Sequence, residues 1–521
     1  MAQAIETKTA NPRDVPSYPD IWPLLFFAPL LVYWPLVAFP YLLMDDNWLI
    51  RGWTEQGYPT LGFVSVVQGR PALAALAGAS ALLVSTLGEF GVQIFRLCGI
   101  AVLGLCCMST YRILGRFPLS QPFRILGAVI WITLPPAQVI MANGTWLTIG
   151  ILSALLATQI LLHGLTLRSA AAAAILLLIS ISTYQPLFFI SPAIYLLSLY
   201  NKDIRVREDF RSLVLHVGFF VGVFVAYYLA WKGLFSYLYP TIQEHRYSPK
   251  ALLSFRQAWE RLPQHFLYRG TRLLDMWDVP NGFPRISGYV QIVLAAVGIA
   301  ALSRWIFAHS QDWRRGLERS LAILFVGPAA FFVSETAVLP SVNWIVSYTV
   351  MMGASLIFSI LLTCLLGYTL ATSPRWLRSA ACTSILALGI VLSSVSVVRH
   401  FAIPTWLDAK AIAQYARTHA LASRLPDGTL YFCYIDKPQD FGIHEFSWNN
   451  VSPFYAYWHT RNVLDLMGED SRKIVVAIRN FRTKEIYDVS PADDFDQALC
   501  RDTNTLDFSR TTKRQLFSDL L

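Results

Sequence analysis

Charged residues are scarce in this chain. Only 14% of its 521 residues are charged and 55% are hydrophobic, whereas a soluble domain is about 25% charged and about 45–50% apolar with glycine included. The mean hydropathy is +0.46. A soluble chain of this length would need more polar groups to cover its surface. The composition therefore excludes a soluble enzyme, a disordered protein and a nucleic-acid-binding protein as first interpretations.

Several familiar motifs are also missing. No Cys and His residues have zinc-ligand spacing, no phosphate-binding or dinucleotide-binding glycine motif occurs, and no internal repeat is evident. The sequence contains 42 Lys and Arg against 33 Asp and Glu, a net charge of +9. In a membrane protein this excess usually reflects cytoplasmic loops and lipid headgroups, so we expect membrane lipids and no nucleic acid as partners.

Apolar runs of about 20 residues, long enough to span a bilayer, recur along the chain. We expect an all-α polytopic membrane protein with about eleven transmembrane helices. Tyr184-Gln185-Pro186 interrupts one long apolar stretch, and because proline disfavours helix continuation we interpret it as two short spans, the alternative being one kinked helix. The expected spans are 21–43, 91–111, 123–142, 145–164, 169–183, 185–200, 212–232, 286–306, 319–337, 343–371 and 376–399.

The distribution of Lys and Arg among the loops predicts the orientation. With the tail 1–20 in the cytoplasm, the inner loops carry the Lys and Arg, and the short outer turns near 142–145, 184 and 338–342 carry none. Counting the Ala-rich run 71–87 as a span would break this pattern. We therefore expect it to form a juxtamembrane or re-entrant helix on the outer face. The inner-loop cations are Arg112, Arg116, Arg124, Arg168, Lys202, Arg205, Arg207, Arg211, Arg304, Arg314, Arg315, Arg319, Arg375 and Arg378.

Beyond the transmembrane domain at 21–399, three segments are expected on the outer side: the loops 44–90 and 233–285, and the tail 400–521. The tail contains a helix-like stretch at 405–423 and strand-like runs at 429–435 and 473–478, which predict a small C-terminal α/β periplasmic domain. Because that compartment is oxidising, we expect Cys433 and Cys500 to form a disulfide.

The first candidate site is the pair Asp45-Asp46, at the outer end of the first span. Adjacent carboxylates at a bilayer boundary repel each other and resist desolvation, and both effects raise pKa values. Ionisable residues at membrane depth tend to mark function, and one of the two could act as a general base towards an acceptor hydroxyl. The alternative is that Asp merely ends the span.

Other candidates lie at the outer boundary. Arg70, just before the juxtamembrane helix, could bind a phosphate bidentately or snorkel to headgroups. Tyr184 and Gln185 could hydrogen-bond a sugar or phosphate, although an aromatic-belt tyrosine is the alternative. Arg246 and Lys250 precede a basic amphipathic stretch that could lie along anionic lipid.

The ordered set of these motifs resembles a known family. A first span that ends in Asp45-Asp46, an outer juxtamembrane helix and many further spans resemble the GT-C glycosyltransferases. Asp45-Asp46, Gly69-Arg70-Pro71 before the Ala-rich helix, and the segment 182–186 (STYQP) together look like the Gtr-type (type II) O-antigen glucosyltransferase family. The resemblance covers about 20–230. One departure is the turn 142–146, which carries no charge here, whereas it is often charged in the family.

The resemblance implies an inverting transfer of a sugar, with glucose as the expected sugar. The donor would be a polyprenyl-phosphate sugar, and the acceptor a lipid-linked or surface glycan on the periplasmic face of the bacterial inner membrane. Asp45 or Asp46 would be the catalytic base; Arg70, Tyr184 and Gln185 would bind the donor phosphate or sugar, with Arg246 and Lys250 as weaker candidates. No cofactor is identified, although some GT-C enzymes use a divalent metal. Two alternatives stay open: a lipid-linked saccharide transporter or flippase, and an O-antigen polymerase or ligase.

Overall fold

A computed structural model describes most of the apolar part of the chain and four short strands in its tail. The described ranges are 21–40, 69–198, 206–238, 313–335, 352–403, 430–436, 474–480, 486–490 and 505–506, apart from 118 and 371–372 within them, together with 260, 303 and 406. The span expected at 286–306, most of the tail helix expected at 405–423, and the outer loops before residue 69 and after residue 238 lie outside these ranges.

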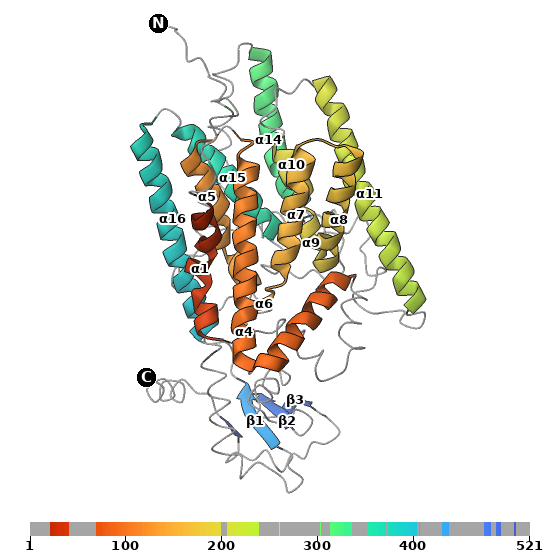
Figure 1. The fold of residues 1–521 in the computed structure, drawn as a ribbon, viewed down its shortest axis with the longest axis vertical. Coiled ribbons are helices and arrows are strands. Elements are labelled where there is room, and N and C mark those ends of the chain that lie inside the picture. The colour runs from red at the N-terminus through yellow and green to blue at the C-terminus, as the bar shows by residue number, and fades with distance from the viewer. Residues whose placement is uncertain are drawn as a thin grey trace.

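The described part of the chain is mostly helical, and its helices run side by side as a bundle (Figure 1). Three helical segments are long and apolar enough to cross a membrane: Pro71–Leu114, Arg211–Leu234 and Arg375–Val397. The helices are α1 (Trp22–Ala38), α4 (Pro71–Leu114), α5 (Gln121–Ile130), η2 (Trp131–Thr133), α6 (Pro135–Asn143), α7 (Leu147–Leu162), α8 (Leu167–Thr183), α9 (Gln185–Phe188), α10 (Ile190–Ser198), α11 (Val206–Leu238), α14 (Trp313–Glu335), α15 (Met352–Thr369), α16 (Arg375–Val397) and η4 (Val398–Ala402).

Helix α4 has two arms that meet at a sharp bend. Gly88 lies at the bend with φ 58° and ψ −132°, a conformation that is essentially restricted to glycine. The first arm runs back from the bend along one end of the bundle, whereas the second passes through the bundle (Figure 1). The expected separation of 71–87 from the span 91–111 is therefore confirmed.

The span expected at 123–142 is interrupted in the structure. Helices α5 and α6 are bent by 55° across η2, so the pair is a broken span or a re-entrant loop. Leu134 has an extended conformation before Pro135-Pro136, and proline begins a helix readily because it needs no intrahelical N–H partner. Counted as one span, the pair is a fourth candidate crossing.

Polar side chains satisfy the backbone at this break. The Tyr33 hydroxyl of α1 donates to the Ile132 carbonyl at 2.5 Å. Gln138 Nε2 donates to the Thr133 carbonyl and to Ser393 Oγ of α16, both at 2.8 Å. Helices α1 and α16 thus hold the broken span, which is required because unpaired backbone groups are costly in an apolar interior.

The chain also breaks between α8 and α9, as expected. Tyr184 is extended, with φ −160° and ψ 118°, and Gln185 begins the short helix α9 with Pro186 in its first turn. The structure therefore has two helices that meet at a turn, as expected, and not one kinked helix. Beyond it, the expected span 185–200 consists of the two short helices α9 and α10.

The core centres on α7, which packs against α4, α8 and α10. Its apolar residues are buried on nearly all sides, including Ile151, Ala154 and Leu155. A helix that is apolar all round belongs in the interior of a bundle. Its first turn lies against the α8–α9 break, because Gly150 faces Thr183 and Leu187.

Four strands form a sheet in the tail, in the order β3-β2-β1-β4. β1 (Leu430–Asp436) pairs in parallel with β2 (Ile474–Asn480) and β4 (Thr505–Leu506), and β2 pairs antiparallel with β3 (Ile486–Ser490). The strands expected at 429–435 and 473–478 are confirmed; β3 and β4 were not anticipated. Because Cys500 lies outside the described residues, the disulfide with Cys433 stays a prediction, as does the helical half of the α/β domain.

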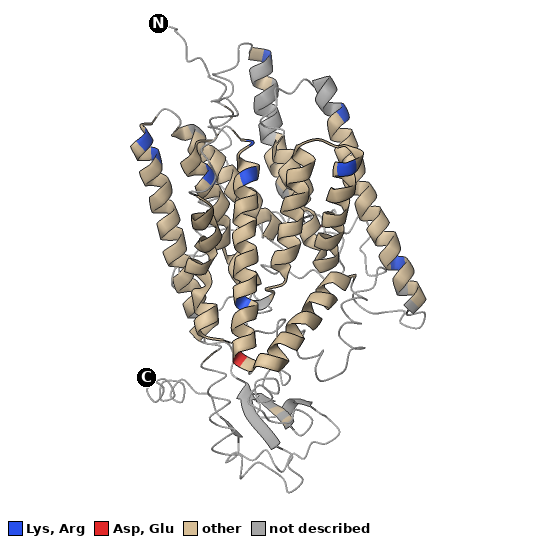
Figure 2. Ribbon diagram, in the orientation of Figure 1, with Lys and Arg blue, Asp and Glu red and all other residues tan. Residues whose placement is uncertain are grey.

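The two ends of the bundle differ in charge. Lys and Arg gather at the end that lies opposite the strands, whereas α4 bends at the strand end (Figure 2). The cations at the basic end belong to the loops that the sequence assigned to one side. In the described part of the chain, most Lys and Arg therefore lie on one side, as the positive-inside pattern predicts.

Candidate functional site

The candidate site is a cluster of side chains around Gly69 and Arg70, where α4 begins. Arg70 is the N-cap residue of α4 and Pro71 opens the first turn. The cluster also contains Tyr184 and Gln185 from the α8–α9 break, more than a hundred residues away in sequence. The structure therefore brings together three of the residues that were expected to bind the donor.

Two contacts fix the Arg70 guanidinium. Its Nε donates to Gln185 Oε1 at 3.2 Å, and its Cζ lies 4.8 Å from the centroid of the Tyr184 ring. The Gln185 Nε2 group donates in turn to the Gly69 carbonyl at 3.3 Å. The amide of Gln185 thus bridges the turn at Gly69 and the arginine that follows it, so the direction of the guanidinium is set from both sides.

Helix α11 forms the other side of the cluster. The Tyr227 hydroxyl donates to the Gly69 carbonyl, and a Cβ at position 69 would lie 2.9 Å from ring carbons of Trp231. Gly69 also has a φ of 73°, which L side chains rarely adopt. Only glycine fits this turn without strain, for both reasons.

The cluster can bind an anion beside an apolar surface. All of Arg70, Tyr184, Gln185, Tyr227 and Trp231 are half-buried, so the site is shielded but reachable. Among the described residues, Arg70 hydrogen-bonds only through Nε. Its terminal amino groups have the fork geometry that binds two oxygens of one phosphate.

Sequence reasoning missed Tyr227 and Trp231. They lie within the expected span 212–232, where aromatic residues carry no distinguishing signal. The strict need for glycine at 69 is visible only in the folded chain, because Trp231 approaches it from a helix far along the sequence.

The remaining candidates lie outside the described residues. Asp45 and Asp46 belong to the segment that joins Pro40 to Gly69 along the chain, and Arg246 and Lys250 follow the end of α11. Their roles stay predictions. Within the described ranges, no group of three or more His, Cys, Asp or Glu residues is placed to hold a metal ion.

A second arginine, Arg96, is buried in the bundle, with 1% of its surface exposed. Its Nη1 donates to the Met141 carbonyl at 2.5 Å and to Thr145 Oγ1, and its Nη2 donates to the Ala142 carbonyl at 2.7 Å. These carbonyls belong to the last turn of α6, where helix carbonyls lack intrahelical partners and cations are favoured. Arg96 therefore caps the C-terminal end of α6.

Arg96 also accounts for the uncharged turn at 142–146. A cation from α4 reaches this turn, which begins with the Ala142 carbonyl and includes the Thr145 hydroxyl. The signal that pointed to Arg96 was its place in an otherwise apolar run, because a charge inside a span needs partners.

Comparison of the chain with protein-family models, with curated proteins and with solved structures found no match.

Proposed function

We propose that the protein is an integral membrane glycosyltransferase. It moves a sugar, with glucose as the expected one, from a polyprenyl-phosphate donor to a lipid-linked or surface glycan. The observation that carries the proposal is the convergence of Arg70, Tyr184 and Gln185 at the start of α4. Arg70 precedes Tyr184 and Gln185 by more than a hundred residues, and the resemblance to GT-C enzymes groups all three as donor-binding residues.

In this proposal Arg70 binds the phosphate of the donor. Two N–H groups that point at one phosphate hold it bidentately, and the charge of the departing polyprenyl phosphate is stabilised where it is released. Gln185 orients the guanidinium and Tyr184 supports it through its ring. A donor that is already in the membrane requires no nucleotide-binding fold.

The acceptor hydroxyl needs a base, and Asp45 or Asp46 supplies it. The base removes the hydroxyl proton as the oxygen attacks the anomeric carbon, and the bond to the phosphate oxygen breaks with inversion. Both carboxylates precede Arg70 in the segment that leads from α1 to Gly69.

The proposal places the basic end of the bundle in the cytoplasm and the site on the periplasmic side. The one-sided distribution of Lys and Arg supports this orientation (Figure 2). About eleven spans, a bacterial inner-membrane location and a periplasmic tail belong to the same proposal. Reporter fusions after residue 400 test it, because a cytoplasmic signal would overturn the orientation.

The decisive test replaces the carboxylates. Membranes that contain Asp45→Asn, Asp46→Asn or the double variant are supplied with a radiolabelled polyprenyl-phosphate sugar, and label in the acceptor glycan is counted. Loss of the base should reduce transfer by about 10²–10⁴-fold. Glu89→Gln is the matched control, because Glu89 is an exposed carboxylate beside the bend of α4. Full activity in both single variants and the double variant would remove the base assignment.

A transporter or flippase for a lipid-linked saccharide is the second candidate, and two observations favour it. The α5–α6 pair is a broken span, and Arg96 is a buried cation that lies eight residues beyond the bend of α4, roughly 12 Å along the helix. Broken helices and buried charges are typical of transport sites. Reconstituted liposomes separate the two candidates: movement of a labelled donor across the bilayer without release of its sugar would favour the transporter.

A further inference from the structure

A cavity of about 540 Å³ lies at the basic end of the bundle, between the first turns of α5 and α16 and the start of α1. Its volume falls within the range of about 300–1,000 Å³ that is typical of small-molecule sites. The Gly69–Arg70 cluster contributes none of its lining. The lining residues are Leu24, Ser120, Gln121, Pro122, Ile125, Leu126, Arg375, Arg378, Ser379, Cys382, Thr383 and Leu386.

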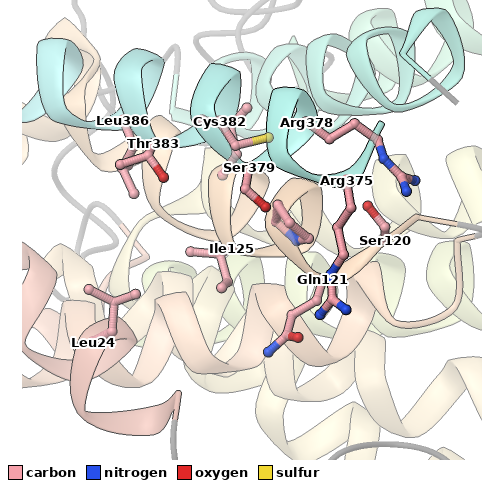
Figure 3. Close-up of a pocket in the computed structure, with 12 residues that line it drawn as sticks. Leu24, Ser120, Gln121, Ile125, Arg375, Arg378, Ser379, Cys382, Thr383 and Leu386 are labelled. Atoms are coloured by element: carbon pink, nitrogen blue, oxygen red, sulfur yellow. The ribbon is translucent and has the colours of Figure 1, made fainter. Parts of the chain in front are cut away.

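The cavity is polar at one end and apolar at the other (Figure 3). Arg375, Arg378 and Ser120 gather at the polar end, and Gln121 extends towards the same space. The opposite end contains apolar side chains such as Leu24 and Leu386. None of the lining residues is acidic, so within the described chain no carboxylate in the cavity neutralises the two arginines. This polarity matches an amphiphile with an anionic head.

Two buried polar atoms at the polar end lack hydrogen-bond partners among the described residues: Ser120 Oγ and Arg378 Nε. Ser120 is the N-cap residue of α5, yet its hydroxyl makes no capping hydrogen bond. A buried polar atom without a partner costs free energy, which a ligand oxygen beside Arg378 would recover. The hydroxyl of Ser120 could donate to the same ligand.

The backbone adds to the positive potential. Helices α5 and α16 both begin at the cavity, and neither N-terminus has a side-chain cap. The first amide groups of a helix carry a partial positive charge that favours anions, and phosphate is the anion most often bound there. Two helix ends and two arginines therefore act on the same small volume.

We propose that this cavity is a binding site for a phosphate-headed lipid. Arg375 and Arg378 bind the phosphate oxygens, Ser120 donates to a third oxygen, and the hydrocarbon chain lies against Leu24 and Leu386. Basic pockets between transmembrane helices bind anionic lipid headgroups. The inference requires only that the bundle is in a membrane, and not that it transfers sugar. Both anionic phospholipid and polyprenyl phosphate have the chemistry that the cavity selects.

The experiment measures lipid retained by the full-length protein in neutral detergent, by native mass spectrometry. Titrations use phosphatidylglycerol, polyprenyl phosphate, phosphatidylcholine and inorganic phosphate. Arg375→Gln with Arg378→Gln should weaken binding of the anionic lipids by about 30-fold, because each cation contributes roughly fivefold beside an anionic lipid. The matched control is Arg112→Gln with Arg168→Gln, which removes two exposed cations outside the cavity and should change binding less than twofold.

A second variant tests the cavity without changing charge. Thr383 is exposed and lines the cavity, so Thr383→Trp should fill part of the space, leave the fold intact and displace the lipid. Tighter binding of either anionic lipid supports the proposal and identifies which lipid the cavity prefers. Equal retention of phosphatidylcholine, equal binding of inorganic phosphate, or an equal loss in the control pair would overturn it.

Discussion

Arg70 is the N-cap residue of α4 and Arg96 lies within α4, but the bundle holds the two arginines in different ways. Arg96 is 1% exposed and donates to the carbonyls of Met141 and Ala142. Arg70 is half-buried and contacts the side chains of Gln185 and Tyr184. Backbone carbonyls at a helix end cannot turn away, whereas side chains can change partners. We therefore expect a structural role for Arg96 and a ligand-binding role for Arg70.

The distinction has an energetic basis. When a buried acceptor loses its donor, it costs about 1–3 kcal/mol because no water replaces the missing hydrogen bond. The free-energy cost is smaller for a half-buried group, since water or a ligand can form the missing hydrogen bond. The same amino acid should therefore affect stability at one position and activity at the other.

The largest effect is expected for Arg96→Leu. This change removes the arginine donor from the carbonyls of Met141 and Ala142 and from the Thr145 hydroxyl, and we expect a loss of about 3 kcal/mol in the free energy of unfolding. Thermal unfolding of the purified protein measures it. Arg112→Leu is the control, because Arg112 is an exposed arginine on the same helix. Wild-type stability in Arg96→Leu would remove the distinction between the two arginines.

Arg70→Gln should have the opposite profile, with stability close to wild type and lower activity. Loss of the charged phosphate contact should reduce kcat/KM for the donor by about 10–150-fold, since even one charged hydrogen bond contributes about 1.5–3 kcal/mol. The measurement is sugar transfer at varied donor concentration, beside thermal unfolding of the same preparation. An unchanged dependence on donor concentration would remove Arg70 from the site.

Much of the helical pattern could be predicted from the sequence, because an apolar run and a proline are local signals. The break at Tyr184 and the separate arm before Gly88 are examples. The break between α5 and α6 was missed. The run 123–142 contains Pro135-Pro136, a local signal for a break, but the groups that stabilise the interruption, such as Tyr33 and Ser393, come from other helices.

In the candidate site, too, the local signals could be predicted from the sequence and the contacts between helices could not. Arg70, Tyr184 and Gln185 could be selected because polar residues at the ends of apolar runs are conspicuous. Their mutual contacts could not, since they depend on how α4 and α9 pack. Tyr227 and Trp231 were hidden among ordinary aromatic residues of a span, and only their position beside Gly69 gives them a role.

A smaller effect is expected for Gly69→Ala, which tests whether the turn positions Arg70. A positive φ costs a non-glycine residue roughly 1–2 kcal/mol, and the new methyl group would also approach Trp231. Gly88→Ala separates the effect of the positive φ from the effect of the close contact. Gly88 also has a positive φ, but a Cβ added there would have no atom within 4 Å. Both variants should lose stability, but only Gly69→Ala should weaken donor use. Equal activity in the two would show that the turn does not position the arginine.

The smallest effect is expected at Tyr184, where the ring and the hydroxyl can be tested apart. A cation above an aromatic ring gains about 0.5–2 kcal/mol, so Tyr184→Leu should raise the donor KM by about 2–30-fold. Tyr184→Phe keeps the ring beneath Arg70 and should remain near wild type if the ring alone supports the guanidinium. Titration of both variants with the donor shows whether the ring or the hydroxyl of Tyr184 is required. If Phe is as damaging as Leu, the hydroxyl contacts the donor, and Tyr184 is itself a ligand-binding residue rather than a support for Arg70.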